Sequence, residues 1–163
     1  MENEIITILL GMSPVLELRG AIPLAVGVFG FMPLKAFFLG TLGSLIPIVP
    51  ILFFLYKFSD FAMKKSYTLN RFLTWLFNRT QLRHQEKFNY HHHAHWRSWM
   101  EFFALLVFVA IPIPFTGVWS GALVAFVFGI PIWRAALAIG LGAIIAGLIV
   151  LSVVLGFIAL PFF

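Results

Sequence analysis

The sequence contains no cysteine and very little charge. Charged residues make up 10% of its 163 positions, and only six are aspartate or glutamate. The absence of cysteine excludes disulfides and thiolate metal sites. So little charge excludes an ordinary soluble domain, in which about a quarter of the residues are charged. With 61% hydrophobic residues and a mean hydropathy of +1.00, the composition indicates an integral membrane protein.

The motifs of common enzyme classes are also missing. The sequence has no Ser/His/Asp constellation, no Walker loop and no paired carboxylates. We therefore expect no catalytic residue, no cofactor and no ATP hydrolysis. The first four residues, Met-Glu-Asn-Glu, lack the basic region of a signal peptide, so we expect uncleaved apolar segments to direct insertion.

The basic residues are concentrated in one stretch. Eleven Lys and Arg residues against six Asp and Glu residues produce a net charge of +5, and eight of the eleven lie between Lys57 and Arg97. A basic segment between apolar blocks is typical of a cytoplasmic loop that faces anionic headgroups. We therefore expect the lipid bilayer, and no nucleic acid, as the partner of this segment, and the cell membrane as the location of the protein.

The same middle segment has a second pattern. Five apolar residues recur at helical spacing: Leu69, Phe72, Leu73, Leu76 and Phe77. This spacing predicts an amphipathic helix on the membrane surface. The histidine cluster His91–His95 could suggest a metal site, but the nearest carboxylate is Glu86 and its surroundings are basic or amide side chains. We therefore expect a solvated loop and no metal there.

Four apolar blocks follow one another along the chain: Ile5–Met32, Leu34–Tyr56, Phe102–Ile130 and Trp133–Phe163. Crossing a bilayer takes about 20 apolar residues in a helix. The second and fourth blocks meet this length, although Pro47 and Pro50 should kink the second. We therefore predict transmembrane helices over 33–57 and 131–160.

Proline and glycine break the first and third blocks in the middle. The third block carries Pro112, Pro114, Gly117 and Gly121 within ten residues. The limbs on either side reach only about half a membrane at roughly 1.5 Å per residue. The first block is interrupted in the same way, at Ser13, Pro14, Gly20, Pro23 and Gly27. These patterns predict re-entrant hairpins over 5–32 and 102–130.

The two halves of the chain resemble each other at a shift of 99 residues. Three short runs coincide: Val28-Phe29-Gly30 with Val127-Phe128-Gly129, Lys35-Ala36 with Arg134-Ala135, and Leu42-Gly43 with Leu141-Gly142. Chance matching between two Phe/Gly/Leu-rich stretches is the alternative. A hairpin plus one crossing in each half makes the repeat inverted, as in many secondary transporters. We therefore predict an all-α integral membrane fold with repeats over 1–58 and 101–163, joined by the basic loop 59–100.

Glu17 and Arg19 form the one acid–base pair inside an apolar block. A charge within the bilayer costs at least about 3 kcal/mol, so such residues usually face a cavity and mark a functional site. The alternative is a shallow hairpin whose charged groups reach interfacial water. We favour a substrate- or ion-binding site that includes the neighbouring Gly20 and Pro23, with Glu17 as the group that binds a coupling proton.

The broken centre of the third block is a second candidate site. A helix that restarts inside the membrane presents unpaired N–H groups and its positive dipole end, which favour an anion. Glycines permit close approach of the substrate, and hydroxyl groups add donors. The alternative is a helix cap that binds nothing. The residues concerned are Pro112, Pro114, Thr116, Gly117, Trp119, Ser120 and Gly121.

Lys35 and Arg134 follow the two hairpins at matching positions. Most such residues are interface anchors whose charged ends reach the headgroups. A gating role at the substrate pathway is the alternative.

Two runs of the sequence resemble signatures of the small multi-drug export proteins. They are Glu17-Leu-Arg-Gly-Ala-Ile-Pro23 and Pro112-Ile-Pro-Phe-Thr-Gly-Val-Trp-Ser-Gly-Ala122, the latter followed by a Phe-Gly-Ile-Pro run that leads to Arg134-Ala135. Phe115 departs from the pattern, in which glycine is more usual. The family is distantly similar to the DedA/VTT superfamily, which implies re-entrant inverted repeats and ion-coupled transport or translocation of polyprenyl phosphate or phospholipid.

We therefore expect a small transporter, coupled to protons or another ion, that exports or translocates an amphipathic substrate. A translocase of an anionic lipid carrier and a non-transporting membrane scaffold are the alternatives. Deletion of residues 66–97 would abolish the function of a scaffold but not that of a transporter. Because two crossings and two hairpins enclose little volume, we also expect a homo-oligomer.

Overall fold

The computed structural model describes residues 1–65, 93–113 and 116–159, and every regular element among them is a helix. The helices are α1 (Glu2–Met12), α2 (Glu17–Gly27), α3 (Pro33–Leu45), α4 (Ile48–Lys65), α6 (His93–Ala110), α7 (Val118–Val127) and α8 (Ile132–Ala159). The predicted all-α class is confirmed for this part of the chain. The predicted amphipathic helix of the middle segment lies outside it.

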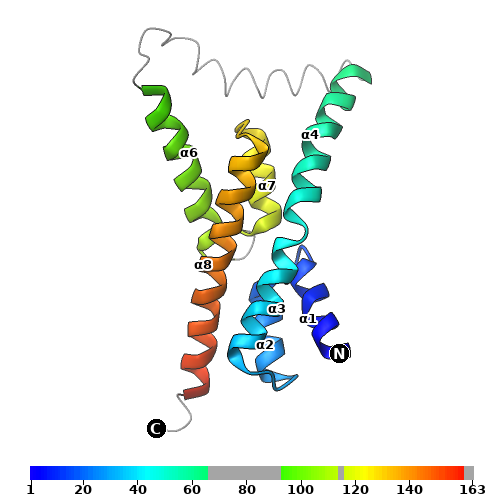
Figure 1. Cartoon of the computed structure of the whole chain (residues 1–163), viewed down its shortest axis with the longest axis vertical. Coiled ribbons are helices and arrows are strands. Elements are labelled where there is room, and N and C mark those ends of the chain that lie inside the picture. Colours follow the sequence, from blue (N-terminus) through cyan, green and yellow to red (C-terminus); the bar gives the residue numbers. More distant parts are fainter. Residues whose placement is uncertain (66–92, 114–115, 160–163) are drawn as a thin grey trace.

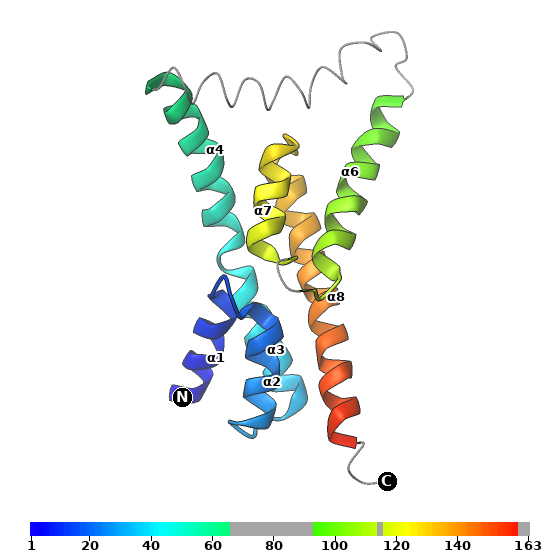
Figure 2. The same ribbon diagram turned by 180° about the vertical axis from the view of Figure 1, so that it is seen from behind.

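The described helices form two pairs, α1–α2 and α6–α7, and two long helical columns, α3–α4 and α8, which we call pillars. In Figures 1 and 2, α8 runs along most of the molecule, and α3 followed by α4 forms a second pillar beside it. The α1–α2 pair occupies one half of the length and the α6–α7 pair the other half. The turn between α1 and α2 faces the turn between α6 and α7 near mid-height (Figure 1). The start of α1 and the end of α8 lie at the same end of the molecule.

The helices break where proline removes a backbone donor. Ser13–Leu16, which contains Pro14, separates α1 from α2, and Pro112 follows the end of α6. The second pillar breaks before Pro47, between the end of α3 and the start of α4. The predicted interruptions of the first and third blocks and the kink in the second therefore correspond to breaks between helices.

Two details of the predicted limbs are wrong. Gly20 and Pro23 do not interrupt the first block, because both lie inside α2. Proline is tolerated within membrane helices where neighbouring groups satisfy the freed carbonyl. The first limb of the third block begins at His93 and not at Phe102, because the polar residues before Phe102 continue the same helix.

Glycine permits the first helix of each pair to pack closely on its pillar. The α1 helix packs on α3, and α6 packs on α8. A Cβ atom on Gly43 would lie 2.4 Å from the Ile8 carbonyl oxygen, and a Cβ atom on Gly142 would lie 2.8 Å from the Leu106 carbonyl oxygen. These contacts leave no room for a side chain, as is common where membrane helices cross through small residues.

The second helix of each pair also crosses its pillar at a glycine. In the first half this glycine lies on the pillar, whereas in the second half it lies on the helix of the pair. Ile22 of α2 lies against Gly40 of α3, where an added Cβ would be 2.8 Å from Cγ1 of Ile22. In the other half the glycine is Gly121 of α7, and Ile139 of α8 supplies an apolar side chain 3.4 Å from the added Cβ. Gly121 and Ile139 stand 99 residues after Ile22 and Gly40. A large and a small residue therefore meet at both crossings.

Among the described residues, two stretches are long and apolar enough to cross a membrane: Pro33–Lys57, which includes α3 and the first part of α4, and Ile132–Phe157 of α8. Both expose large apolar side chains, such as Phe53 on α4 and Leu137 on α8. Soluble monomers rarely expose large continuous apolar patches. The outer surface of these helices therefore suits contact with lipid.

Candidate functional site

The two candidate sites of the sequence meet at the centre of the molecule. Glu17 is the first residue of α2, and Gly117 immediately precedes α7. The Glu17 side chain is 7% exposed, and its backbone φ of +48° is in the left-handed region. A non-glycine residue persists in this conformation only where its surroundings hold it, at a cost of about 1–3 kcal/mol.

The carboxylate of Glu17 occupies the start of α7. A Cβ atom on Gly117 would lie 1.8 Å from Oε2 of Glu17, so only glycine leaves room for this carboxylate. Oε1 of Glu17 accepts a long hydrogen bond of 3.5 Å from the backbone N–H of Trp119. The first N–H groups of a helix have no intrahelical partner, and its dipole favours negative charge there. The chain's own carboxylate thus lies at the end of α7 where the sequence predicts an anion.

Arg19 binds the other side of the same turn. Its guanidinium donates to the carbonyl oxygen of Thr116, and it donates a second bond of 3.1 Å to the Thr116 hydroxyl. The Nε atom of Arg19 is buried and has no hydrogen-bond partner among the described residues. Arg19 therefore joins the start of α2 to the turn before α7, and its buried Nε–H is left unsatisfied among the described residues.

Local hydrogen bonds hold the turn before α7. The Thr116 hydroxyl lies 2.6 Å from the carbonyl oxygen of Ile111 and 2.9 Å from that of Ile113, and its single proton serves either acceptor. The Gly117 N–H donates to Oγ of Ser120 over 2.8 Å. This network pre-positions the Thr116 and Gly117 backbone, so the turn does not depend on a ligand for its shape.

Trp119 connects the start of α7 to the end of α1. Its indole Nε1–H donates to the carbonyl oxygen of Met12 over 3.3 Å. That carbonyl belongs to the last residue of α1 and has no continuing helix to satisfy it. The indole therefore caps one helix while its own backbone N–H faces Glu17.

A cavity of about 700 Å³ opens between the two turns. Its walls are mostly apolar, with Glu17 and Arg19 as the charged groups among them. Ligand pockets of this size and character are typical of drug-sized molecules, for which a few polar groups fix orientation. The lining residues are Pro14, Val15, Leu16, Glu17, Arg19, Gly20, Pro112, Gly117, Trp119, Ser120 and Leu123.

Most of the predicted site residues meet at this cavity, but three described ones do not line it. Thr116 contacts Arg19 behind the wall, and Gly121 packs against Val109. Pro23 lies inside α2, beyond the part of the helix that reaches the cavity. Pro114 and Phe115 fall outside the described residues.

Sequence reasoning missed the apolar contribution of the first turn. Pro14, Val15 and Leu16 line the cavity, and Leu123 lines it one turn after Trp119. These residues are ordinary apolar side chains without a distinguishing pattern. Val15, next to Pro14, lines the cavity while remaining 88% exposed.

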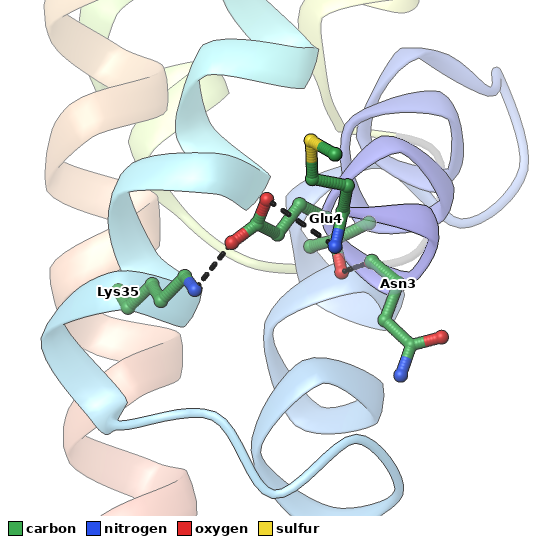
Figure 3. A network of polar contacts seen from close by, with 5 residues as sticks. Asn3, Glu4 and Lys35 are labelled. Atoms are coloured by element: carbon green, nitrogen blue, oxygen red, sulfur yellow. Dashed lines mark hydrogen bonds and ion pairs between the residues drawn. The ribbon is translucent and has the colours of Figure 1, made fainter.

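The two matching basic residues lie far from the cavity and have different partners. Lys35 donates to Oε1 of Glu4 over 2.5 Å, as Figure 3 shows. This ammonium lowers the pKa of the Glu4 carboxyl below its ordinary value. Arg134 instead donates to the hydroxyl of Ser98 on α6. Neither residue lines the cavity at Glu17, so its described walls give no support to a gating role.

The described residues contain no group of three His, Asp or Glu side chains that could hold a metal ion. In the histidine cluster, His93–His95 belong to α6, so the expected loop is wrong for these three residues; the structure describes none of the cluster's side chains.

A family model described as "Putative small multi-drug export protein" matches residues 17–149. This range begins at Glu17 and contains both signature runs, together with the whole wall of the cavity from Glu17 onward. The comparison with curated proteins found no match, and neither did the comparison with solved structures.

Proposed function

The chain belongs to this family of small multi-drug export proteins, and on that premise we propose that it is an ion-coupled transporter of an amphipathic substrate. The observation that carries the proposal is the cavity between the two turns. It combines a largely apolar wall with the charge pair Glu17 and Arg19, and an amphipathic molecule needs both kinds of surface.

In the proposed architecture, each helix pair is a re-entrant hairpin and each pillar crosses the membrane. The α1–α2 and α6–α7 pairs each extend over half of the molecule, and their turns meet in the middle (Figure 2). The matched glycine contacts of Gly43 and Gly142, and the exchanged Ile22–Gly40 and Ile139–Gly121 pairs, support an inverted repeat. A site at the interface of two such repeats, at mid-depth, is the usual arrangement in secondary transporters.

Glu17 is the proposed coupling group. Its carboxylate occupies the positive end of α7, and protonation would remove the negative charge that the helix end favours. An anionic headgroup of a substrate could then take the place of the carboxylate, while Arg19 supplies its unused Nε–H. Protonation of Glu17 would thus prepare this position for an anionic headgroup, which would couple proton binding to substrate binding.

This exchange favours one second candidate function, translocation of an anionic lipid carrier. A phosphate headgroup matches both the N–H groups of α7 and the guanidinium of Arg19. The apolar walls would then lie along the start of its chains. A homo-oligomer would enlarge the small volume that two pillars enclose, and we include it in the proposal.

The test is transport by the purified protein in proteoliposomes with an imposed pH gradient. Substrates of two kinds are offered, amphipathic cationic dyes and a headgroup-labelled polyprenyl or glycerol phosphate. Glu17→Gln should abolish pH-driven movement of whichever substrate the wild type carries. Glu4→Gln, which removes a carboxylate far from the cavity, is the matched control and should transport normally. Transport by Glu17→Gln at the wild-type rate and with the same pH profile would exclude Glu17 as the coupling group.

A further inference from the structure

The internal repeat supplies a comparison for the two basic residues Lys35 and Arg134. Each is the third residue of a pillar helix, α3 or α8, and each follows a glycine of positive φ, Gly30 at +64° or Gly129 at +67°. The starts of α3 and α8 lie toward opposite ends of the molecule (Figure 1), so the two cations have matching places in the two helices. Their environments can be compared directly.

The chain neutralises one of these cations with its own carboxylate. Glu4 forms an ion pair with Lys35, and the ammonium also lies 4.6 Å from the centre of the Phe31 ring. Arg134 has a neutral partner instead, the Ser98 hydroxyl. Among the side chains that the structure describes, the ion pairs involve Glu4, and none includes Arg134. Among the described side chains, Arg134 therefore has no anionic partner of the kind that Lys35 has.

A pocket of about 210 Å³ lies beside Arg134. Arg134 and Ser98 supply its polar groups, and Trp99, Phe102 and Leu137 form its apolar wall. The carboxylate of Glu101, three residues after Ser98, is not among the lining residues. This volume is several times the roughly 30 Å³ of a water molecule, so it admits a larger polar group beside the guanidinium.

The position of this pocket indicates what kind of anion would fill it. Arg134 stands at the start of the apolar stretch Ile132–Phe157, where a crossing helix would meet the headgroup region. Trp133 beside it is 81% exposed, and tryptophan is enriched at that level of a membrane. The wall made by Phe102 and Leu137 suits acyl chains, and arginine binds phosphate through two parallel hydrogen bonds.

We propose that this pocket binds the phosphate of an anionic phospholipid, in the role that Glu4 has for Lys35 in the other half. The site is separate from the cavity at Glu17 and does not depend on the transported substrate. Occupation would neutralise Arg134 and connect α6 to α8 through Ser98 and the lipid.

Native mass spectrometry of the full chain in detergent tests the proposal, with phosphatidylglycerol and phosphatidylcholine of identical acyl chains as probes. The wild type should prefer phosphatidylglycerol. Arg134→Gln should weaken phosphatidylglycerol binding about tenfold, as expected for loss of a charge-assisted contact, and leave phosphatidylcholine unchanged. Lys35→Gln is the matched control: it also removes one positive charge, but from a cation already paired, so the preference should persist.

Two further variants keep the test decisive if Arg134→Gln does not fold. Arg134→Lys retains the charge and should keep the preference, whereas Ser98→Glu supplies an internal carboxylate and should remove it. Equal loss in Lys35→Gln and Arg134→Gln, or an unchanged preference in Ser98→Glu, would overturn the proposal. Competition by millimolar inorganic phosphate would overturn the assignment to a lipid, because the site would then recognise a free anion.

Discussion

At the scale of single residues, the centre of the molecule depends on one glycine and one carboxylate. Gly117 has no side chain, and the space that a Cβ atom would take is filled by Oε2 of Glu17. Glu17 in turn has an unfavourable backbone conformation, with φ at +48°. The strained backbone of Glu17 and the missing side chain at Gly117 together bring a negative charge to the positive end of α7.

The contact between Gly117 and Glu17 predicts a specific non-additivity. Gly117→Ala should destabilise the protein by about 1–3 kcal/mol, because the added methyl group overlaps the carboxylate. In a Glu17→Ala background the same substitution should cost much less, since the overlapping atoms are gone. Thermal unfolding of the four proteins in one detergent measures the cycle. Gly27→Ala, where no atom lies within 4 Å of the added Cβ, is the control. Equal costs in both backgrounds would contradict the observed contact.

The ion pair of Lys35 and Glu4 predicts how the Glu4 carboxyl near the N-terminus titrates. The ammonium lowers the pKa of Glu4, so the pair stabilises the fold above the ordinary range of a carboxyl and loses this effect as pH falls through the lowered pKa. Lys35→Gln should raise the Glu4 pKa toward its ordinary value, whereas Lys35→Arg should not. Carbon NMR of labelled glutamate measures both. An unchanged Glu4 pKa in Lys35→Gln would show that the pair is not formed in solution.

Sequence reasoning found the residues of the centre but not their mutual contacts. Glu17 and Arg19 stood out because charge is rare in an apolar block, and Gly117 because it closely follows two prolines. The hydrogen bond from Trp119 to the Met12 carbonyl joins residues 107 positions apart. No local pattern encodes such a pair, since any exposed carbonyl at a helix end could accept the indole N–H. The presence of an anion at α7 could be predicted, but not that the chain itself supplies it.

At the scale of helices, breaks were easier to predict than beginnings. Pro14, Pro47 and Pro112 each lie at a break because proline lacks the N–H that a continuing helix needs. Pro23 has the same chemistry yet lies inside α2, which shows that proline alone does not fix where a helix ends. The start of α6 at His93 was missed because hydropathy marks where a helix becomes apolar and not where its backbone begins.

The crossing of α6 and α8 predicts which glycine of α8 is required. Gly142→Val should destabilise the protein by about 1–3 kcal/mol, because the added atoms meet the Leu106 carbonyl and the Val109 side chain. Gly156→Val on the same helix should be nearly neutral, since no atom lies within 4 Å of its added Cβ. Thermal unfolding in detergent compares the two. A similar loss at both positions would mean that helix propensity, and not the crossing, determines the cost.

At the scale of the whole molecule, the meeting of two helix pairs explains how a short chain can place a cavity at mid-height. Each half contributes one turn, and the two turns meet with Glu17 on one side and Gly117 on the other. The shift of 99 residues was visible in the sequence at Gly30 and Gly129, which both have positive φ in the structure. Sequence comparison at this shift could not reveal that the isoleucine and glycine of the Ile22–Gly40 contact change places in the Gly121–Ile139 contact. A large residue then aligns with a small one, so the positions do not match.

The same arrangement predicts which parts of the chain lie on each side of a membrane. The turn after α2 and the turn after α7 lie toward opposite ends of the molecule (Figure 1), and each contains an exposed residue, Val28 or Phe128. Because the basic residues between Lys57 and Arg97 favour the cytoplasm, Phe128 should face the cytoplasm and Val28 the outside. The chain has no cysteine, so Val28→Cys, Phe128→Cys and Lys87→Cys each introduce a single thiol. An impermeant maleimide should label Val28→Cys in intact cells, and the other two only after permeabilisation. Labelling of Val28→Cys and Phe128→Cys from the same side would be incompatible with two hairpins that enter from opposite faces.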